Sequence, residues 1–363
     1  MANTVQMTDN IIQTDERYMR RCLDLASMAE GHTSPNPMVG SVIVCDGRII
    51  GEGYHRKAGT PHAEVNAVES VKDKALLCRS TLYVNLEPCA HWGRTPPCAK
   101  LIIDSRIPEV VVGCVDTFSA VSGKGIEMMR EAGVNVRVGV LEEECRTLNR
   151  RFFTYHEKRR PYIILKWAES ADGYIDAPPT SAQRPVWLTN DACRRLVHKQ
   201  RTTEGAIVIG VNTALLDNPS LTPRMWKGAQ PLRVIIDPRL RAPESLTLLG
   251  DELPTLILNA ERDAELAPGK TLRRIDFGSG GVGAVLDELH RMQIQSIIVE
   301  GGGVTLLHFI DAGLWDEAWR YRGKAYLADG VRAPRLHYDP REIKQMRTLT
   351  IDDAMLDIIE KKH

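Results

Sequence analysis

One histidine, one glutamate and two cysteines are the residues best suited to chemistry in the first half of this 363-residue chain. His62 and Glu64 enclose an alanine at the start of a helical pattern. Cys89 follows a Glu-Pro pair after a short apolar run, and Cys98 comes after eight intervening residues. One imidazole and two thiolates suit a tetrahedral zinc ion that keeps its fourth position open for water, which is typical of a catalytic site.

The open fourth position of the zinc ion indicates hydrolytic chemistry by a metal-bound water. Zinc lowers the pKa of a bound water to about 7, so that hydroxide is available at neutral pH. In zinc deaminases a glutamate that is not a metal ligand carries protons to the leaving amine. The pattern therefore predicts His62, Cys89 and Cys98 as Zn²⁺ ligands, with Glu64 as the catalytic proton carrier.

Two other interpretations of these residues stay open. His62 could be a surface histidine, with the two cysteines as packing residues. Alternatively, His91 could supply a fourth ligand and close the site. The spacing of eight residues between the cysteines also departs from the two residues that zinc deaminases usually have.

Short apolar runs predict the elements that position these residues. Buried strands are expected at residues 41–45, 81–85 and 110–115, and apolar residues recur at helical spacing over residues 16–30. Alternating strands and helices predict a layered α/β domain over residues 1–150.

A second series of apolar runs predicts another α/β domain over residues 161–363. The chain is longer than one hydrophobic core usually supports, so two domains are expected. Residues 151–160, which are charged and aromatic and precede Pro161, are the predicted linker. The strands of the second domain are expected at 162–166, 205–209, 233–236, 255–258 and 296–299.

Composition narrows the classes of function. Hydrophobic residues make up 43% of the chain and charged residues 26%, which is globular. The 47 basic residues balance the 47 acidic ones, so no net field attracts nucleic acid or an anionic membrane. We find neither an export-type leader nor an apolar run of about 20 residues, and expect a cytoplasmic protein that does not contact membranes. In that compartment the eight cysteines are expected to be reduced.

The stretch PCAHWGRTPPC at residues 88–98 resembles the deaminase half of the bifunctional riboflavin-biosynthesis deaminase/reductase family. SPNPMVG at 34–40 and GEGYHRKAGTPHAE at 51–64 also resemble that family. The resemblance implies a cytidine-deaminase-like three-layer domain with the zinc ligands and proton carrier named above. It also implies substrate contacts from Asn36 and His55, although the first could only shape a turn and the second could cap a loop.

Arg94 and Lys124 are the residues predicted to hold a substrate phosphate. Exposed cations in loops pair readily with phosphate oxygens, although each could instead be a solvated charge. The stretch DTFSAVSGKG at 116–125 matches the family's run, except that Phe118 stands where the family usually has asparagine.

ILKWAESADGYI at residues 164–175 and DNPSLTPR at 217–224 resemble the family's second domain, which has a dihydrofolate-reductase-like fold and uses NADPH. The sequence departs from that family at two places. Pro185 stands where the family usually has a serine, and RYRGKAYLADG at 320–330 replaces the family's customary closing stretch. Lys166, on the expected strand before Ala168, is a further candidate for a polar contact with the ribose that is reduced in the substrate. The resemblance implies that NADPH is lined by Ala168, Trp187, Thr213 and Asp217, and that the substrate is faced by Arg201, Leu221, Arg224 and Glu300.

Gly301, Gly302 and Gly303 are predicted to hold the cofactor phosphates, because bare backbone N–H groups between a strand and a helix can approach a pyrophosphate. A tight turn is the other interpretation. A rival is GSGGVG at 278–283, which fits the dinucleotide pattern G-x-G-x-x-G. Against this rival, LRRID at 272–276 makes a poor buried parallel strand, and too little chain follows to complete a doubly wound sheet.

The resemblance thus implies a bifunctional enzyme acting on a phosphorylated pyrimidine. It would deaminate 2,5-diamino-6-ribosylamino-4(3H)-pyrimidinone 5′-phosphate and then reduce the ribosyl to a ribityl chain with NADPH. One alternative is a zinc deaminase of another nucleoside, nucleotide or tRNA base whose C-terminal domain is non-catalytic or differently specific. The other is a binding or regulatory protein that has kept the fold and lost the chemistry. Relatives of both domains commonly form homo-oligomers, which we also expect here.

Overall fold

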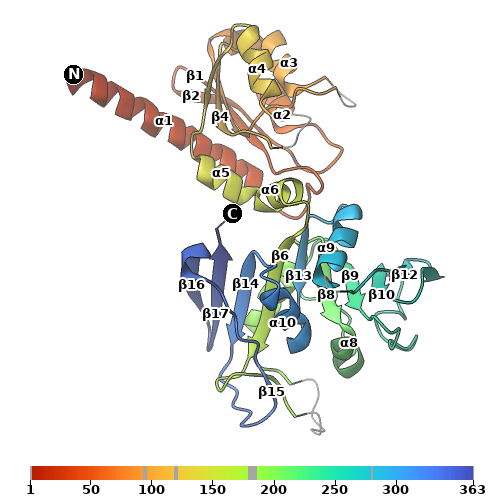
Figure 1. Cartoon of the computed structure of the whole chain (residues 1–363). Coiled ribbons are helices and arrows are strands. Elements are labelled where there is room, and N and C mark those ends of the chain that lie inside the picture. Colours follow the sequence, from red (N-terminus) through yellow and green to blue (C-terminus); the bar gives the residue numbers. More distant parts are fainter. Residues whose placement is uncertain (1, 93–95, 118–121, 179–185, 279–280, 363) are drawn as a thin grey trace. The chain divides into compact units, whose positions relative to one another are not determined.

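The computed structural model describes residues 2–92, 96–117, 122–178, 186–278 and 281–362 (Figure 1). The chain forms two compact units, Met1–Lys158 and Arg159–His363, which are described separately below. Arg94, Phe118 and Pro185, which the sequence singled out, lie outside the described residues. Among the described helices, none combines the length and the apolar character that crossing a membrane requires.

The first unit contains a five-stranded sheet in the order β2-β1-β3-β4-β5. Strand β1 pairs antiparallel with β2 and β3, whereas β3, β4 and β5 run parallel. The three strands expected from apolar runs are confirmed as β1, β3 and β4. The elements are α1 (Ala2–Ser27), β1 (Gly40–Cys45), β2 (Arg48–Tyr54), α2 (Ala63–Ser70), the 3₁₀ turn η1 (Lys74–Arg79), β3 (Thr81–Leu86), α3 (Cys98–Asp104), β4 (Glu109–Cys114), α4 (Lys124–Glu131), β5 (Asn135–Val138), α5 (Glu142–Leu148) and α6 (Arg150–Glu157).

Alternate side chains of this sheet enter two separate hydrophobic cores, as the pleat of a strand requires. On β4, Val110 and Val112 pack against α2, α3 and α4, whereas Val111 packs on the opposite face against α1, α5 and α6. The sheet is therefore the middle of three layers, as predicted (Figure 1).

The segment expected to be a linker is helical over most of its length. Phe152 and Phe153, in α6, are 7% and 3% exposed and belong to the core that α1 and α5 cover. The two aromatic side chains bury apolar surface there, which holds the charged run against the first unit instead of leaving it extended. The first compact unit accordingly ends at Lys158.

The second unit is built on a ten-stranded sheet in the order β11-β12-β10-β9-β8-β13-β6-β14-β17-β16, and β7 pairs with β15 in a separate ribbon. Its elements are β6 (Tyr162–Glu169), β7 (Tyr174–Asp176), α7 (Asp191–Arg201), β8 (Ala206–Gly210), α8 (Val211–Asp217), β9 (Leu232–Ile236), β10 (Thr255–Asn259), β11 (Ala264–Ala267), β12 (Lys270–Arg274), α9 (Gly281–Arg291), β13 (Ser296–Val299), α10 (Gly303–Asp311), β14 (Glu317–Arg322), β15 (Val331–Arg332), the 3₁₀ turn η2 (Pro340–Glu342), β16 (Ile343–Ile351) and β17 (Ala354–Lys361).

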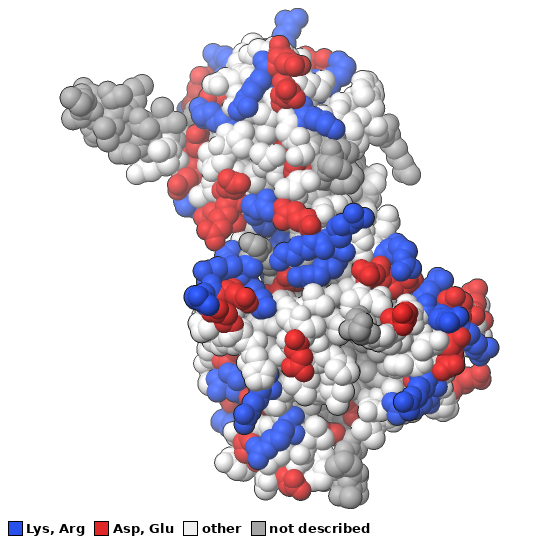
Figure 2. All heavy atoms as spheres, in the orientation of Figure 1, with Lys and Arg blue, Asp and Glu red and all other residues white. Residues whose placement is uncertain are grey.

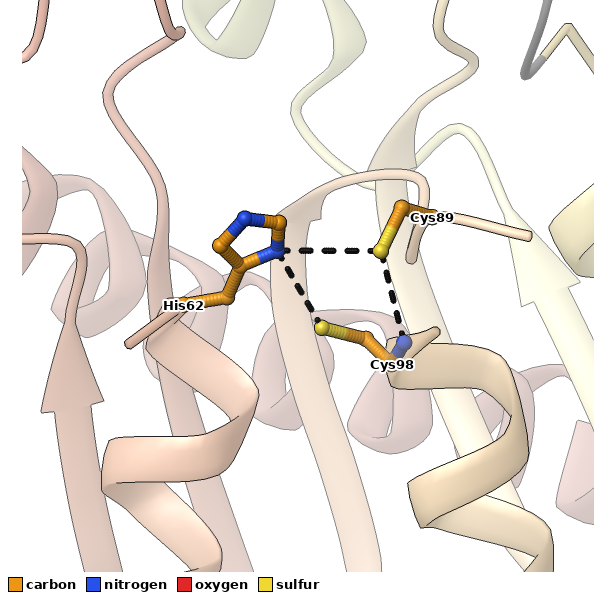
Figure 3. A group of neighbouring side chains, drawn as sticks. All are labelled: His62, Cys89 and Cys98. Atoms are coloured by element: carbon orange, nitrogen blue, oxygen red, sulfur yellow. Dashed lines mark hydrogen bonds between the residues drawn. The ribbon is translucent and has the colours of Figure 1, made fainter. Parts of the chain in front are cut away.

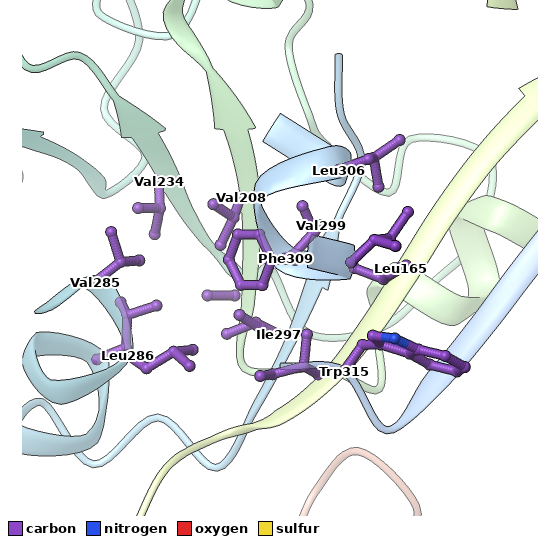
Figure 4. Close-up of a cluster of buried hydrophobic side chains, with 14 of the residues drawn as sticks. Leu165, Val208, Val234, Val285, Leu286, Ile297, Val299, Leu306, Phe309 and Trp315 are labelled. Carbon is purple, nitrogen blue, oxygen red and sulfur yellow. The ribbon is translucent and has the colours of Figure 1, made fainter. Parts of the chain in front are cut away.

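The main core of this unit lies between the central strands and helices α9 and α10 (Figure 4). Val208 on β8, Val299 on β13 and Phe309 on α10 are each fully buried there. A buried side chain of this kind contributes about 1.5–3 kcal/mol relative to an exposed one. Both faces of the central strands are covered, which explains why these strands read as uninterrupted apolar runs.

LRRID contributes residues 272–274 to β12, which pairs parallel with β10, so a parallel strand does form there, although it is not a fully buried one. Only β11 lies beyond β12 in the sheet, and the Arg273 and Arg274 side chains reach solvent. The rival dinucleotide motif still fails on topology. A Rossmann unit joins neighbouring parallel strands through its helix, whereas the strand that follows α9 is β13, which lies between β8 and β6.

Acidic and basic side chains lie interspersed over each unit in the view of Figure 2. This mixing agrees with the balance of 47 basic and 47 acidic residues in the sequence.

Candidate active sites

The structure brings the three predicted zinc ligands together (Figure 3). His62 lies just before α2, Cys89 follows β3, and Cys98 is the first residue of α3. The Nδ1 atom of His62 is 3.6 Å from the Cys89 sulfur and 3.4 Å from the Cys98 sulfur. The three ligand atoms all lie within 4.8 Å of one another. One nitrogen and two sulfurs at this spacing fit a tetrahedral zinc ion with one position left over.

His91 does not complete the set of ligands. Its side chain is exposed, and the group of potential metal ligands found among the described residues contains only His62, Cys89 and Cys98. A closed four-ligand structural site therefore has no support from this arrangement.

The backbone helps to prepare the Cys89 sulfur for a metal. The Cys98 amide N–H donates to the Cys89 sulfur at 3.3 Å. Hydrogen bonds from the Cys98 thiol, from His62 and from that amide lower the pKa of the Cys89 thiol to about 4, although burial opposes the shift. The thiolate is the form that binds metal.

Glu64 lies in the first turn of α2 and is 3% exposed. Burial, reinforced by the negative charge of Cys89, raises the pKa of the Glu64 carboxyl to about 7, while His62 acts in the opposite direction. A carboxyl group with a pKa near neutrality can both accept and release a proton, as a general acid and base must.

Asn36 and His55 form a pair beside the zinc ligands. The Asn36 side-chain nitrogen is 3.1 Å from Nε2 of His55, and Nδ1 of His55 is 3.1 Å from the Pro61 carbonyl oxygen. A carbonyl only accepts, so Nδ1 of His55 carries the proton and Nε2 accepts from the Asn36 amide. The His55 ring meets the His62 ring edge to face at 5.4 Å. The pair thus fixes which way the Asn36 amide points.

Glu87 is a positioning residue that the sequence analysis missed. Its buried carboxylate accepts from the amides of Asp116 (3.2 Å), Gly123 (2.9 Å), Gly125 (2.9 Å) and Ile126 (3.3 Å). This clamp fixes the start of α4, and with it the exposed Lys124, next to the Cys89 loop. The available signal was a glutamate adjacent to the Pro-Cys pair.

In the second unit, Glu300 joins two predicted substrate residues. Its carboxylate accepts two hydrogen bonds of 2.8 Å from Arg201 and lies 3.6 Å from Nζ of Lys166. Burial alone would raise the pKa of Glu300, but the charges of Arg201 and Lys166 outweigh it and lower the pKa to about 2. The Arg201 guanidinium is also 3.4 Å from the Thr222 carbonyl, which ties α7 to the DNPSLTPR loop.

The glycine turn before α10 offers bare backbone where the cofactor phosphates were predicted. A Cβ atom on Gly302 would lie 3.1 Å from the Thr213 hydroxyl, and one on Gly303 would lie 3.1 Å from Ile175. Gly301 has φ +102°, and its carbonyl accepts from the Gly210 amide at 2.9 Å. The structure thus places the Thr213 hydroxyl beside Gly302. A side chain in place of the hydrogen of Gly302 or Gly303 would fill the space that these glycines leave open.

The other predicted reductase residues occupy several elements. Ala168 lies on β6 opposite Tyr321 of β14, and Asp217 ends α8. Leu221 is buried, and Arg224 is exposed and donates to the Ser220 hydroxyl at 3.3 Å. Trp187 is 57% exposed and stacks with Arg194 at 4.5 Å.

His198 is a buried histidine on α7, and its Nδ1 atom has no hydrogen-bond partner among the described residues. Burial, together with the nearby charges of Arg201 and Arg224, lowers the pKa of His198 to about 4. The fold therefore favours the neutral ring of His198. Above a pH of about 6.5 the ring is neutral in both the folded and the unfolded chain, so it does not lower the free energy of unfolding. As the pH falls towards 4 the unfolded chain binds a proton that the folded one resists, and this part of the stability is lost.

We expect His198→Gln to remove part of the acid sensitivity of the second unit. Urea unfolding gives the free energy of unfolding at pH 7.5 and at pH 5. Between these two pH values the wild type should lose more of this free energy than His198→Gln does. His337→Gln, which replaces an exposed histidine of the same unit, serves as the control. An equal loss in all three proteins would contradict the assignment.

Two family models match the chain. The cytidine and deoxycytidylate deaminase zinc-binding region matches residues 12–114, and the RibD C-terminal domain matches residues 161–323. These matches agree with the predicted combination of a cytidine-deaminase-like domain with a dihydrofolate-reductase-like domain, which is confirmed.

The relatives cover nearly the whole chain. The riboflavin biosynthesis protein RibD of Aquifex aeolicus is 41% identical, over 88% of this chain and 90% of its own length. The Escherichia coli RibD is 35% identical, over 88% of this chain and 90% of its own length. The crystal structure of the diaminohydroxyphosphoribosylaminopyrimidine deaminase/5-amino-6-(5-phosphoribosylamino)uracil reductase of Thermotoga maritima matches with a TM-score of 0.85 at 34% identity, covering 97% of this chain and 99% of its own. The chain therefore belongs to the RibD family and is a bifunctional deaminase and reductase of riboflavin biosynthesis that uses Zn²⁺ and NADPH.

Proposed function

We propose that the chain deaminates 2,5-diamino-6-ribosylamino-4(3H)-pyrimidinone 5′-phosphate and then reduces the ribosyl group of the product to a ribityl chain. Residues 1–150 carry the deaminase, residues 161–363 carry the reductase, and residues 151–160, most of which form α6 against the first unit, connect the two parts. The observation that supports this most strongly is the convergence of His62, Cys89 and Cys98 beside the buried Glu64.

In the deaminase, His62, Cys89 and Cys98 hold the metal. Zinc, when bound, supplies an activated water at neutral pH. Glu64 takes up the proton of that water and delivers it to the exocyclic nitrogen, which leaves as ammonia while the ring carbon becomes a carbonyl. A pKa of about 7 leaves Glu64 able to do both.

Recognition of the pyrimidine falls to residues around the metal. Asn36 is oriented by His55 and presents the rest of its amide to the ring. Lys124 is exposed at the start of α4 and pairs with the 5′-phosphate, and Arg94 is proposed as its partner in this role.

In the reductase, Glu300 holds Arg201 and Lys166 where the ribose binds. NADPH, when bound, supplies the hydride that converts the ribose C1′ into a CH₂ group. Gly301, Gly302 and Gly303 receive its phosphates beside Thr213, and Ala168, Trp187 and Asp217 line the rest of the cofactor. Leu221 and Arg224 complete the substrate side, and Lys166 contacts the ribose.

We also propose a cytoplasmic homo-oligomer, a dimer or larger, that binds small phosphorylated substrates and no nucleic acid. The balance of basic and acidic residues and their mixing on the surface support the last point (Figure 2).

The direct test is an assay of both activities on one purified chain. With the pyrimidinone phosphate, we expect one ammonia and one oxidised NADPH per substrate consumed, and no NADPH oxidation before ammonia appears. Cytidine monophosphate and tRNA are the comparison substrates. Preferred deamination of either one, or ammonia release with no NADPH oxidation, would reject the corresponding half of the proposal.

A further inference from the structure

Two asparagine side chains hold the backbone of the loop that carries Asn36. Asn85, on β3, is fully buried, and Asn149, between α5 and α6, is 2% exposed. Both reach the segment that follows Asn36 and enters β1. Neither residue was singled out from the sequence.

Asn149 pairs with both backbone groups of one residue. Its side-chain oxygen accepts from the Met38 amide at 2.8 Å, and its side-chain nitrogen donates to the Met38 carbonyl at 2.9 Å. This two-point contact imitates the pairing of one strand residue with another. It joins residues 111 positions apart in the sequence.

Asn85 completes the arrangement from the sheet. Its side-chain nitrogen donates to the same Met38 carbonyl at 3.1 Å, and its oxygen accepts from the Gly40 amide at 2.8 Å. Gly40 is tightly enclosed, because a Cβ atom there would lie 2.1 Å from the Cys22 carbonyl. The Met38–Gly40 backbone is therefore fixed on several sides.

The clamped segment supports both substrate-contacting candidates. Asn36 is two residues before Met38, and its amide donates to the Thr33 carbonyl at 2.8 Å. The His55 amide donates to the Val39 carbonyl at 2.9 Å, within the clamped segment. The Asn36 side chain then meets the His55 ring at 3.1 Å. A shift of Met38 would move both partners of this pair relative to the metal ligands.

We infer that Asn149, acting with Asn85, is a positioning residue of the deaminase that sets the placement of Asn36 and His55 for the pyrimidine. The inference rests on the proposed function, because it assumes that these two residues contact the substrate. Displacements of about 1 Å in a binding group can lower the rate about a hundredfold. Asn149 touches none of the predicted zinc ligands in the described contacts, so its effect should appear in substrate binding rather than in metal content.

The test compares Asn149→Ala with Asn36→Ala, the double variant and Asn259→Ala. Asn259 is an equally buried asparagine that holds a loop of the second unit with the amides and carbonyls of its own neighbours, and it is the matched control. Two measurements are made on the full-length zinc-loaded protein. These are kcat and KM for ammonia release, and hydrogen exchange of the Met38 and Gly40 amides.

We expect Asn149→Ala to raise the deaminase KM about tenfold or more, to lower kcat by less, and to speed exchange at Met38 and Gly40. Zinc content and the reductase KM should stay unchanged. The double variant should have a KM close to that of Asn36→Ala, since the two residues act in one chain of contacts. Asn259→Ala should alter neither the deaminase KM nor exchange at these amides.

Unchanged exchange at Met38 would overturn the clamp, and faster exchange with an unchanged KM would overturn its role in substrate placement. A double variant whose KM rise equals the product of the two single rises would also overturn it. Hydrogen exchange requires no substrate, so it tests the clamp independently of the deaminase assay. If the wild type releases no ammonia from the pyrimidinone, the proposed function is rejected, and the exchange rates still show whether Asn149 holds Met38.

Discussion

Glu64→Gln should lower ammonia release by about 10²- to 10⁴-fold, the range that a general acid-base group usually contributes. Glutamine keeps the size of the side chain but cannot accept and return a proton. His62, Cys89 and Cys98 are untouched, so the zinc content should equal that of the wild type. NADPH-dependent reduction of the deaminated substrate by the second unit should also be unchanged.

Glu69→Gln is the matched control, because Glu69 lies on the same helix and is exposed. Steady-state ammonia release and metal analysis on the two variants and the wild type separate loss of chemistry from loss of metal. If Glu64→Gln retains turnover with bound zinc, another group carries the proton and the assignment of Glu64 is wrong.

Glu300→Gln should abolish most of the reductase activity and destabilise the second unit. The carboxylate compensates the charges of Arg201 and Lys166, whose side chains are only 12% and 16% exposed, and removing one partner of a buried ion pair typically costs about 3–5 kcal/mol. NADPH oxidation should fall about a hundredfold or more, because the two cations that we propose to face the substrate lose the group that orients them. Ammonia release should be unaffected.

Glu317→Gln is the control that separates a loss of stability in the second unit from a loss of the positioning of Arg201 and Lys166. Glu317 is a buried glutamate on β14 that accepts from Tyr162 and Trp319, so its loss should lower stability without a large change in the reductase KM. Urea unfolding and NADPH oxidation are measured on both variants. Equal kinetic losses in Glu300→Gln and Glu317→Gln would show that the effect of Glu300 is only structural.

Local features of the sequence predicted the strands and named three residues, His62, Cys89 and Cys98, that the structure brings together. Runs such as Val110 to Val112 predict buried strands because each residue enters a core on one face or the other. His62, Cys89 and Cys98 were recognisable because the H-x-E and P-C signatures of zinc deaminases are short local patterns. The fold brings these residues together from the start of α2, the loop after β3 and the start of α3.

What the sequence did not predict depends on partners far along the chain. Glu87 clamps amides about 30 to 40 residues away, and Asn149 pairs with Met38. Neither contact leaves a periodic pattern. The charged residues of α6 indicate a linker in the sequence, whereas the core that receives Phe152 and Phe153 leaves no local signal there. Similarly, LRRID forms a parallel strand because its position near the sheet edge leaves the arginines in solvent.

The coordination of zinc in the isolated protein tests the account most directly. Zinc-edge X-ray absorption on the purified chain should show one zinc bound by two sulfurs at about 2.3 Å, one imidazole nitrogen and one further light atom from solvent. A second imidazole or a third sulfur in the shell would indicate a closed structural site. That result, or a protein that binds no zinc while all four residues are intact, would contradict the deaminase chemistry derived from His62, Glu64, Cys89 and Cys98.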